Sequence, residues 1–179
     1  GIAPKKAKLE YYKTNKINNI GLTSPHSVTI PGSVHAWCSM HEKYGNIELE
    51  EVLLGAINFA RNGFPIHEVE ALAWKENENK LKANENSKNL FLKNNKSYGY
   101  GEVFKNYQLA NTLQNIAKHK IKGFYESNIT RDMVKTLNSL GGLHTEEDFY
   151  SQRTSFTQTI SNYYKDYKIH QCPLYGPGI

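Results

Sequence analysis

The first third of the chain combines strand-like and helix-like hydrophobic patterns. Val28 and Ile30 stand between polar neighbours, and this period of two predicts a half-buried strand near residues 27–31. Ser33 follows the Pro-Gly pair that ends this strand, at the place where the N-cap of a helix belongs. A longer helix comes next, with an apolar face at helical spacing formed by Leu49, Val52, Leu53, Ala56, Ile57 and Ala60. Such a face has to pack against another part of the protein.

Helical patterns also dominate the remaining chain. Further helices are expected at residues 8–16, 67–82, 107–117 and 129–137. Near the C-terminus the pattern changes to β alternation, which predicts a hairpin near residues 156–171 with its turn at Ser161-Asn162. The expected class is therefore α+β and predominantly helical. Residues 1–179 are expected to form a single, partial domain.

Composition narrows the possible functions. The chain has 179 residues, of which 39% are hydrophobic, and this length can bury a core without disulfides or metals. Its two cysteines, Cys38 and Cys172, lie far apart, and Cys38 is expected to be a packed core thiol. No apolar run is long enough to span a bilayer. The formal charge of +5 is not concentrated on one basic face, so nucleic-acid binding is not expected.

Motifs for metal, nucleotide or serine-hydrolase chemistry are absent from the sequence. The seven histidines contain no HxxxH or HExxH pair, and no P-loop, GxGxxG or Gly-x-Ser-x-Gly motif occurs. No metal or other cofactor is therefore implied. Thr145 and Asp148 have the spacing of a helix capping box, which gives the acidic residues near Asp148 a structural explanation.

Several stretches in fixed order resemble the γ-glutamyltransferase family, also called γ-glutamyltranspeptidase or glutathione hydrolase. The chain carries Ser27-Val28-x-x-Pro31-Gly32, then Tyr44-Gly45, and then Gly63-Phe64-Pro65-Ile66 at the end of the long helix. The resemblance continues through the helix that starts at Tyr107, through Gly123-Phe124-Tyr125, and through Gly141-Gly142-x-x-Thr145-x-Glu147-Asp148. It covers nearly the whole chain, but only as the central part of the family's large subunit.

This resemblance implies a segment of an N-terminal nucleophile hydrolase, whose fold is an αββα sandwich. In the family the precursor cleaves itself, and the threonine freed at the new N-terminus attacks the γ-glutamyl carbonyl. That threonine belongs to the small subunit, the implied partner, and the implied substrates are γ-glutamyl small molecules such as glutathione. An arginine that grips the substrate's α-carboxylate would lie just before residue 1, because Ala3-Pro4 resembles the pair that follows it.

Within this chain the resemblance therefore implies no catalytic, substrate-binding or metal-ligating residue, and the segment alone is expected to be inactive. Two positions depart from the family pattern: Asp166 replaces a usual glycine, and Leu174-Tyr175 alters a Pro-rich loop. The loop is closer to the form of the cephalosporin-acylase-like branch. A related acylase and a non-catalytic scaffold or binding domain therefore remain as alternatives. Family members are often exported, which favours a periplasmic or extracellular location, but a cytoplasmic one stays open.

Overall fold

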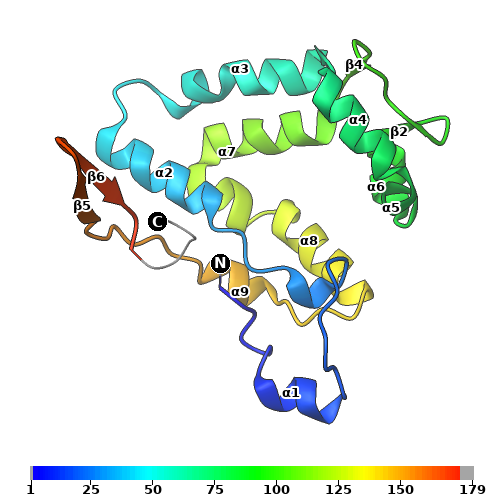
Figure 1. The fold of residues 1–179 in the computed structure, drawn as a ribbon, viewed down its shortest axis with the longest axis horizontal. Helices are drawn as coiled ribbons and strands as arrows, with labels where there is room; N and C mark the ends of the chain where they lie inside the picture. The colour runs from blue at the N-terminus through cyan, green and yellow to red at the C-terminus, as the bar shows by residue number, and fades with distance from the viewer. Residues whose placement is uncertain (1, 174–179) are drawn as a thin grey trace.

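The structure, a computed structural model, describes residues 2–173 and is mostly helical (Figure 1). Its helices are α1 (Leu9–Thr14), α2 (Ser33–Tyr44), α3 (Leu49–Asn62), α4 (Glu68–Glu76), α5 (Glu78–Lys82), α6 (Glu85–Phe91), α7 (Tyr107–Tyr125), α8 (Asn128–Ser139) and α9 (Glu146–Tyr150), with a 3-10 turn η1 (Pro25–Ser27). The strands form three two-stranded antiparallel sheets. They are β1 (Phe64–Pro65) with β4 (Val103–Phe104), β2 (Leu92–Lys93) with β3 (Lys96–Ser97), and β5 (Ile160–Tyr164) with β6 (Tyr167–Gln171). This confirms the predicted α+β, predominantly helical class.

The main core lies where α2, α7, α8 and α9 meet, and α3 runs beside α7 (Figure 1). Its buried residues are Ile30, Val34, Cys38, Leu49, Ile116, Phe124, Tyr125, Val134 and Phe149. The α3 face is buried at Leu49, Ile57 and Ala60, as predicted, whereas Val52 is 51% exposed. The apolar stripe that α3 packs against α7 is therefore narrower than the spacing of its apolar residues predicts.

A second, aromatic cluster holds the segment between α3 and α7 together. The ring of Trp74 lies 5.4 Å from that of Phe91 and 5.0 Å from that of Phe104, each in an edge-to-face arrangement. Tyr98 packs on the same Phe104 ring at 5.5 Å. Such pairs stabilise by about 1 kcal/mol beyond their buried area. The short helices α4 to α6 are thus anchored by side chains rather than by a continuous sheet.

The predicted strand near residues 27–31 is reduced to a single β-bridge. Ile30 pairs with Ile2, while residues 25–27 form the turn η1. The hydroxyl of Ser24 caps this turn by accepting a hydrogen bond from the His26 amide at 3.3 Å. The prediction of a strand is confirmed only at Ile30, because residues 25–27 form a turn and, within residues 2–173, only Ile2 pairs with this segment.

Two helix boundaries also differ from the prediction. Ser33 is the first helical residue of α2, and Gly32 occupies the N-cap position without a side-chain hydrogen bond. The helix expected at residues 67–82 is split at Asn77, whose side-chain amide donates to the carbonyl of Ala73 at 2.9 Å. An asparagine that bonds to nearby main-chain groups competes with the helical pattern, and this accounts for the break.

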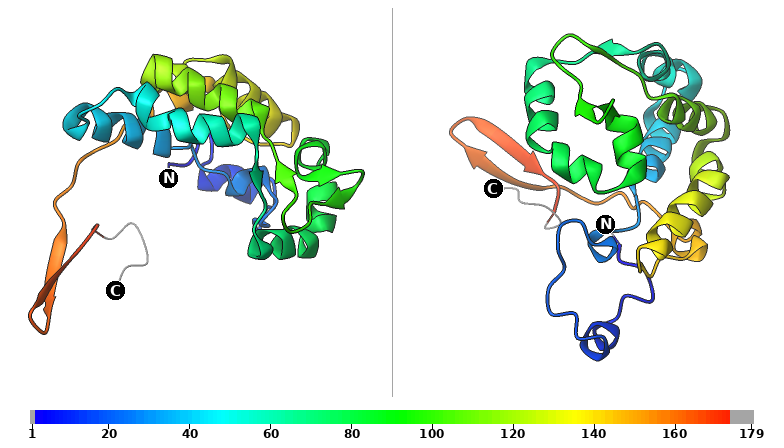
Figure 2. Two further views of the ribbon diagram at one scale, coloured as in Figure 1. Left: turned by 90° about the horizontal axis from the view of Figure 1, so that it is seen from above. Right: turned by 90° about the vertical axis from the view of Figure 1, so that its right-hand side faces the viewer.

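The C-terminal hairpin is confirmed, but its turn lies elsewhere than predicted. Tyr164 pairs with Tyr167, so the turn is at Lys165-Asp166 and not at Ser161-Asn162. The positive φ of 53° falls on Lys165, and Asp166, which replaces the family's glycine, has no positive φ. An extended segment leads to the hairpin, which stands away from the helices (Figure 2). Leu174 and Tyr175 lie outside the described residues.

The N-terminal segment is tied to α9 through the carboxylate of Asp148. Thr145 and Asp148 form the predicted capping box, with Thr145 N and Oγ1 donating to Oδ2 of Asp148 at 2.9 and 2.7 Å. The amide of Lys5 donates to the other carboxylate oxygen at 3.0 Å. Burial by itself would raise the pKa of Asp148, but the hydrogen bonds from Lys5 and Thr145 outweigh it and hold the pKa below 3.8.

Within α7, Lys120 adopts φ 53° and ψ −133°, a conformation that is common only for glycine. Replacing Lys120 with glycine should remove this strain and raise the free energy of unfolding by about 1 kcal/mol. The matched control is Lys118→Gly, two residues earlier. This variant should lower the free energy of unfolding by about 1 kcal/mol, because Lys118 has ordinary helical angles and glycine is a poor helix former. Urea unfolding measures both, and equal destabilisation by the two variants would contradict the strained geometry.

Replacing Asp148 with asparagine should lower the free energy of unfolding by about 1 to 3 kcal/mol at pH 7, because three donors lose a charged acceptor. Since the folded pKa is lowered, the carboxylate stabilises fully above its unfolded pKa and loses this effect as the pH falls through the folded pKa. The difference between wild type and variant should therefore shrink below about pH 4. Unfolding curves at several pH values test this, with exposed Asp132→Asn as the control. A difference independent of pH would refute the assigned role.

Candidate functional site

The N-terminal segment lies along the Pro-Gly turn that precedes α2. The amide of Ile30 donates to the carbonyl of Ile2 at 2.8 Å, and Ile30 is 2% exposed. Pro4, two residues after Ile2, is buried, and the amide of Lys5 donates to the carboxylate of Asp148. These contacts fix the path of residues 2–5. Sequence periodicity does not reveal the pairing, because Ile2 and Ile30 belong to no repeating pattern.

A buried tyrosine connects this turn to the end of α7. The hydroxyl of Tyr125 donates to the carbonyl of Pro31 at 2.7 Å and accepts a hydrogen bond from the His35 amide at 3.2 Å. Burial raises the pKa of Tyr125, which keeps the hydroxyl protonated and able to donate. Burial and the nearby Arg153 guanidinium lower the pKa of His35, which favours its neutral imidazole. In the sequence, Tyr125 stands out only as part of the Gly123-Phe124-Tyr125 motif, and no spacing connects it with Pro31 or His35.

Two further buried side chains line the same segment. His144 is 2% exposed, and its Nε2 lies 2.9 Å from the carbonyl of Val28. Since a carbonyl only accepts, Nε2 carries a proton. The Gln152 amide donates to the carbonyl of Arg153 at 3.1 Å and packs closely on Gly32, where an added Cβ would lie 3.2 Å from its nitrogen. Among residues 2–173 no partner reaches Nδ1 of His144 or Oε1 of Gln152.

The side chains that could bind a metal ion do not come together in the described part of the chain. Cys38 is buried as predicted, and burial raises the pKa of its thiol, which makes it a poor nucleophile. Cys172 is exposed. Within the described part of the chain no group of three or more His, Cys, Asp or Glu side chains is placed to hold a metal ion. None of the helices between residues 2 and 173 is long and apolar enough to cross a membrane.

The side chains around Pro31 form a hydrogen-bonded framework. Tyr125 donates to the Pro31 carbonyl, Nε2 of His144 lies against the Val28 carbonyl, and one oxygen of Asp148 accepts from the Lys5 amide. Each of these contacts uses a main-chain atom of the N-terminal segment or of the stretch before α2. Such contacts fix a backbone path and can position a neighbouring residue. The expectation that the chain contains no catalytic or substrate-binding residue stays a prediction.

Comparisons with known proteins identify the framework. The sequence model of the gamma-glutamyltranspeptidase family matches residues 1–179. The chain is 29% identical over 152 residues to the glutathione hydrolase-like YwrD proenzyme of Bacillus subtilis. This match covers 85% of this chain and 29% of the relative. The chain therefore spans less than a third of this relative's length.

Two solved structures share the fold at similar identity. Gamma-glutamyltranspeptidase of Helicobacter pylori has a TM-score of 0.86 and 28% identity, and the match covers 96% of this chain and 51% of that one. Cephalosporin acylase of Bacillus halodurans has a TM-score of 0.88 and 26% identity, and the match covers 95% of this chain and 33% of that one. The expected fold is that of an N-terminal nucleophile hydrolase segment, and these neighbours confirm it. Because the family match extends over the whole sequence, the chain belongs to the gamma-glutamyltranspeptidase family.

Proposed function

We propose that residues 1–179 form the central part of the large subunit of a γ-glutamyltransferase or glutathione hydrolase. The observation that carries this is the family match over the whole chain. The names of the Bacillus subtilis and Helicobacter pylori relatives support the same activity. The partner is the small subunit released from the same precursor, and the substrates are γ-glutamyl compounds such as glutathione.

The proposed reaction proceeds through a covalent ester. The hydroxyl of an N-terminal threonine outside this chain attacks the γ-glutamyl carbonyl while its own α-amine accepts the hydroxyl proton. The amide C–N bond breaks, the leaving amine takes that proton, and the γ-glutamyl group stays on the threonine oxygen. Water or a second amine then attacks the ester and releases the threonine. Residues 1–179 contribute no reacting group to these steps and are inactive by themselves.

The role of this chain is to position the substrate-binding part of the large subunit. In the family, an Ala-Pro pair, which corresponds to Ala3-Pro4 here, follows a short motif whose arginine binds the α-carboxylate. The hydrogen bonds of Ile2 with Ile30 and of Lys5 with Asp148 flank that pair. Tyr125 donates to the carbonyl of Pro31, the residue after Ile30, so it supports the same segment. A small displacement of this segment would move the arginine relative to the substrate.

A related acylase is the second candidate, because the cephalosporin acylase of Bacillus halodurans matches the fold with a TM-score of 0.88. The two activities share the nucleophile and differ in the acyl group that the cleft accepts. Parallel assays with a γ-glutamyl anilide and with an acyl-cephalosporin amide separate them.

The deciding experiment is the mass, under denaturing conditions, of the product of the whole reading frame that contains this segment. We expect two chains, separated by a cut directly before a threonine, and hydrolysis of a γ-glutamyl anilide by the cleaved protein. A single uncut chain without activity would remove the catalytic proposal and leave a non-catalytic scaffold. Cleavage with activity only on the cephalosporin amide would favour the acylase.

Tyr125→Phe tests the positioning role in the intact protein. Loss of the hydroxyl leaves the Pro31 carbonyl and the His35 amide without their partner, so we expect a threefold or larger rise in KM for the γ-glutamyl donor, roughly 1 kcal/mol of binding. The value of kcat should change less. The control is Tyr107→Phe, whose ring is 55% exposed at the start of α7. A KM equal to that of the control would argue against a positioning role for Tyr125.

A further inference from the structure

Residues 5–27 form a lobe that projects from the helical core at one end of the molecule (Figure 2). It consists of α1, none of whose residues is buried, and of the loop that returns to η1. The lobe holds five lysines and one glutamate, a formal charge of +4, whereas the rest of the chain holds 17 basic and 16 acidic residues. Most of the net charge of the chain therefore lies in this part, which we call the basic lobe.

The positive charge of the basic lobe is not neutralised by the described part of the protein. All five lysines are exposed. Lys5 forms an ion pair with Oε1 of Glu147 at 3.7 Å, but both side chains are largely exposed, and such surface pairs are weak. Between residues 2 and 173 no carboxylate forms an ion pair with the other four, which are Lys6, Lys8, Lys13 and Lys16. The lobe can therefore attract an anionic partner.

Large apolar side chains are exposed on the same lobe. Leu22, on the returning loop, is 92% exposed, and Leu9, on α1, is 62% exposed. Leu9 and Lys13 are four residues apart, so they lie on one face of α1. Ile20 is exposed as well. The basic lobe thus presents apolar and cationic side chains to solvent together.

Leucines that are exposed among lysines are typical of a surface that lies on an anionic bilayer. The apolar side chains enter the interface, while the flexible lysine stems let the ammonium groups stay at the level of the lipid phosphates. We propose that the basic lobe binds the surface of membranes that contain anionic lipids, with Leu9 and Leu22 in the interface and the lysines of the lobe against the phosphates. This binding is independent of the proposed function, because it requires no cleavage of the protein.

A nucleic acid fits the basic lobe less well, although it too is a polyanion. Single strands bind by stacking their bases on free aromatic rings. Here the Tyr12 ring lies 5.5 Å from that of Tyr11 and 5.3 Å from that of His26, so these rings pack on one another. The exposed side chains of Leu9 and Leu22 gain nothing from contacts with phosphates. An interface that takes up apolar side chains therefore accounts for more of the lobe.

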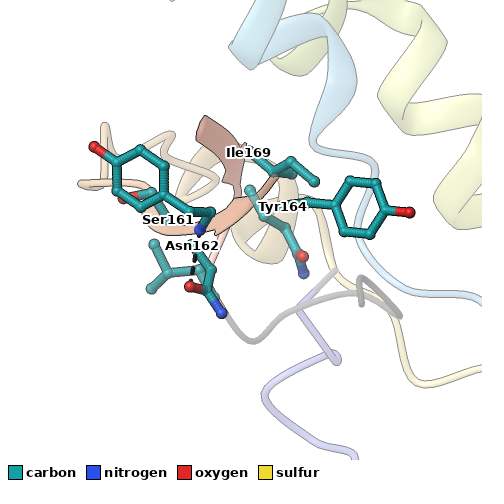
Figure 3. A pocket seen from close by; sticks show the side chains of 7 residues that line it. Ser161, Asn162, Tyr164 and Ile169 are labelled. Carbon is teal, nitrogen blue, oxygen red and sulfur yellow. Dashed lines mark hydrogen bonds between the residues drawn. The ribbon is translucent and has the colours of Figure 1, made fainter. Parts of the chain in front are cut away.

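The exposed surface of the β5–β6 hairpin is of a different kind. A hollow of about 380 Å³ runs along the hairpin, and Ser161, Asn162, Tyr164 and Ile169 are among the residues that line it (Figure 3). None of the residues that line this hollow is charged. The hollow offers no counter-charge to anionic lipids, so charge attraction selects the basic lobe.

The test measures how the protein from the whole reading frame partitions onto vesicles of phosphatidylcholine with about 30% phosphatidylglycerol. The double variant Lys8→Glu with Lys13→Glu is compared with Lys118→Glu with Lys135→Glu. All four lysines are exposed and both variants remove the same charge, but only the first pair lies in the basic lobe. We expect the lobe variant to lower the partition coefficient by about thirtyfold or more, and the control by much less.

Leu22→Ser tests the apolar part of the contact without changing the charge. We expect it to lower the partition coefficient by about threefold, because the serine side chain gains nothing from the interface. Wild type should not bind vesicles of phosphatidylcholine alone, and its binding to the anionic vesicles should weaken as salt is raised. Unchanged melting temperatures show that the variants fold, as expected for exposed positions.

The outcomes separate the inference from the proposed function. An uncut protein that binds anionic vesicles through the basic lobe would sustain the inference while the proposed function fails. Equal losses in the two double variants, or no binding of wild type to anionic vesicles, would overturn the inference. A short DNA duplex that displaces the protein from the vesicles, and that Leu22→Ser binds as well as wild type does, would instead assign the lobe to nucleic acid.

Discussion

The hydroxyl of Tyr125 is the contact on which the framework around Pro31 depends. It joins the end of α7 to the first turn of α2 by donating to the Pro31 carbonyl and accepting from the His35 amide. Both partners are main-chain groups close to the helix start, where unpaired amides are costly if they are buried. With this turn fixed, Ile30 can pair with Ile2, and the N-terminal segment then reaches Asp148 on α9. Three segments far apart in sequence thus meet through a few polar atoms.

The structure uses its tyrosines in two opposite ways. Tyr125 is 2% exposed, and both hydrogen-bonding functions of its hydroxyl are used inside the core. Tyr164 and Tyr167 are mostly exposed and sit on a hairpin whose apolar side faces solvent. The difference follows from topology, because α7 is enclosed by α2, α3 and α8 while β5 and β6 contact chiefly each other. The enclosed tyrosine therefore joins buried segments, whereas the exposed ones contribute little to the packing of the described helices.

The sequence predicts elements whose hydrophobic pattern repeats over several helical turns. It does not predict features that depend on a single contact or on one residue's backbone angles. Helix α3 was located from its apolar stripe and its end at Gly63, whose φ is 94°. Alternation predicted a strand near residues 27–31, but only Ile30 has a pairing partner among the described residues. The hairpin turn was displaced because the positive φ falls on Lys165, a residue type that does not indicate it.

The site was harder to predict than the fold. The bonds of Tyr125 span 94 and 90 residues, and no spacing rule connects such positions. The sequence predicts the Thr145–Asp148 capping box because both partners lie within one helical turn. It does not predict the further hydrogen bond from Lys5 to Asp148, which spans 143 residues. Resemblance to a family located the right region without showing which atoms meet there.

The overall fold of this chain is shared with proteins that are about one quarter identical to it. Solved structures only 26 to 28% identical to this chain have TM-scores of 0.86 and 0.88. Here the N-terminal segment and the Pro-Gly turn are held through the carbonyls of Ile2, Val28 and Pro31 and the amides of Ile30, His35 and Lys5. Main-chain atoms are the same in every residue type except for the missing amide of proline. The arrangement therefore constrains few side chains, chiefly those of Tyr125, His144 and Asp148, and leaves the surrounding apolar residues free to change at constant volume.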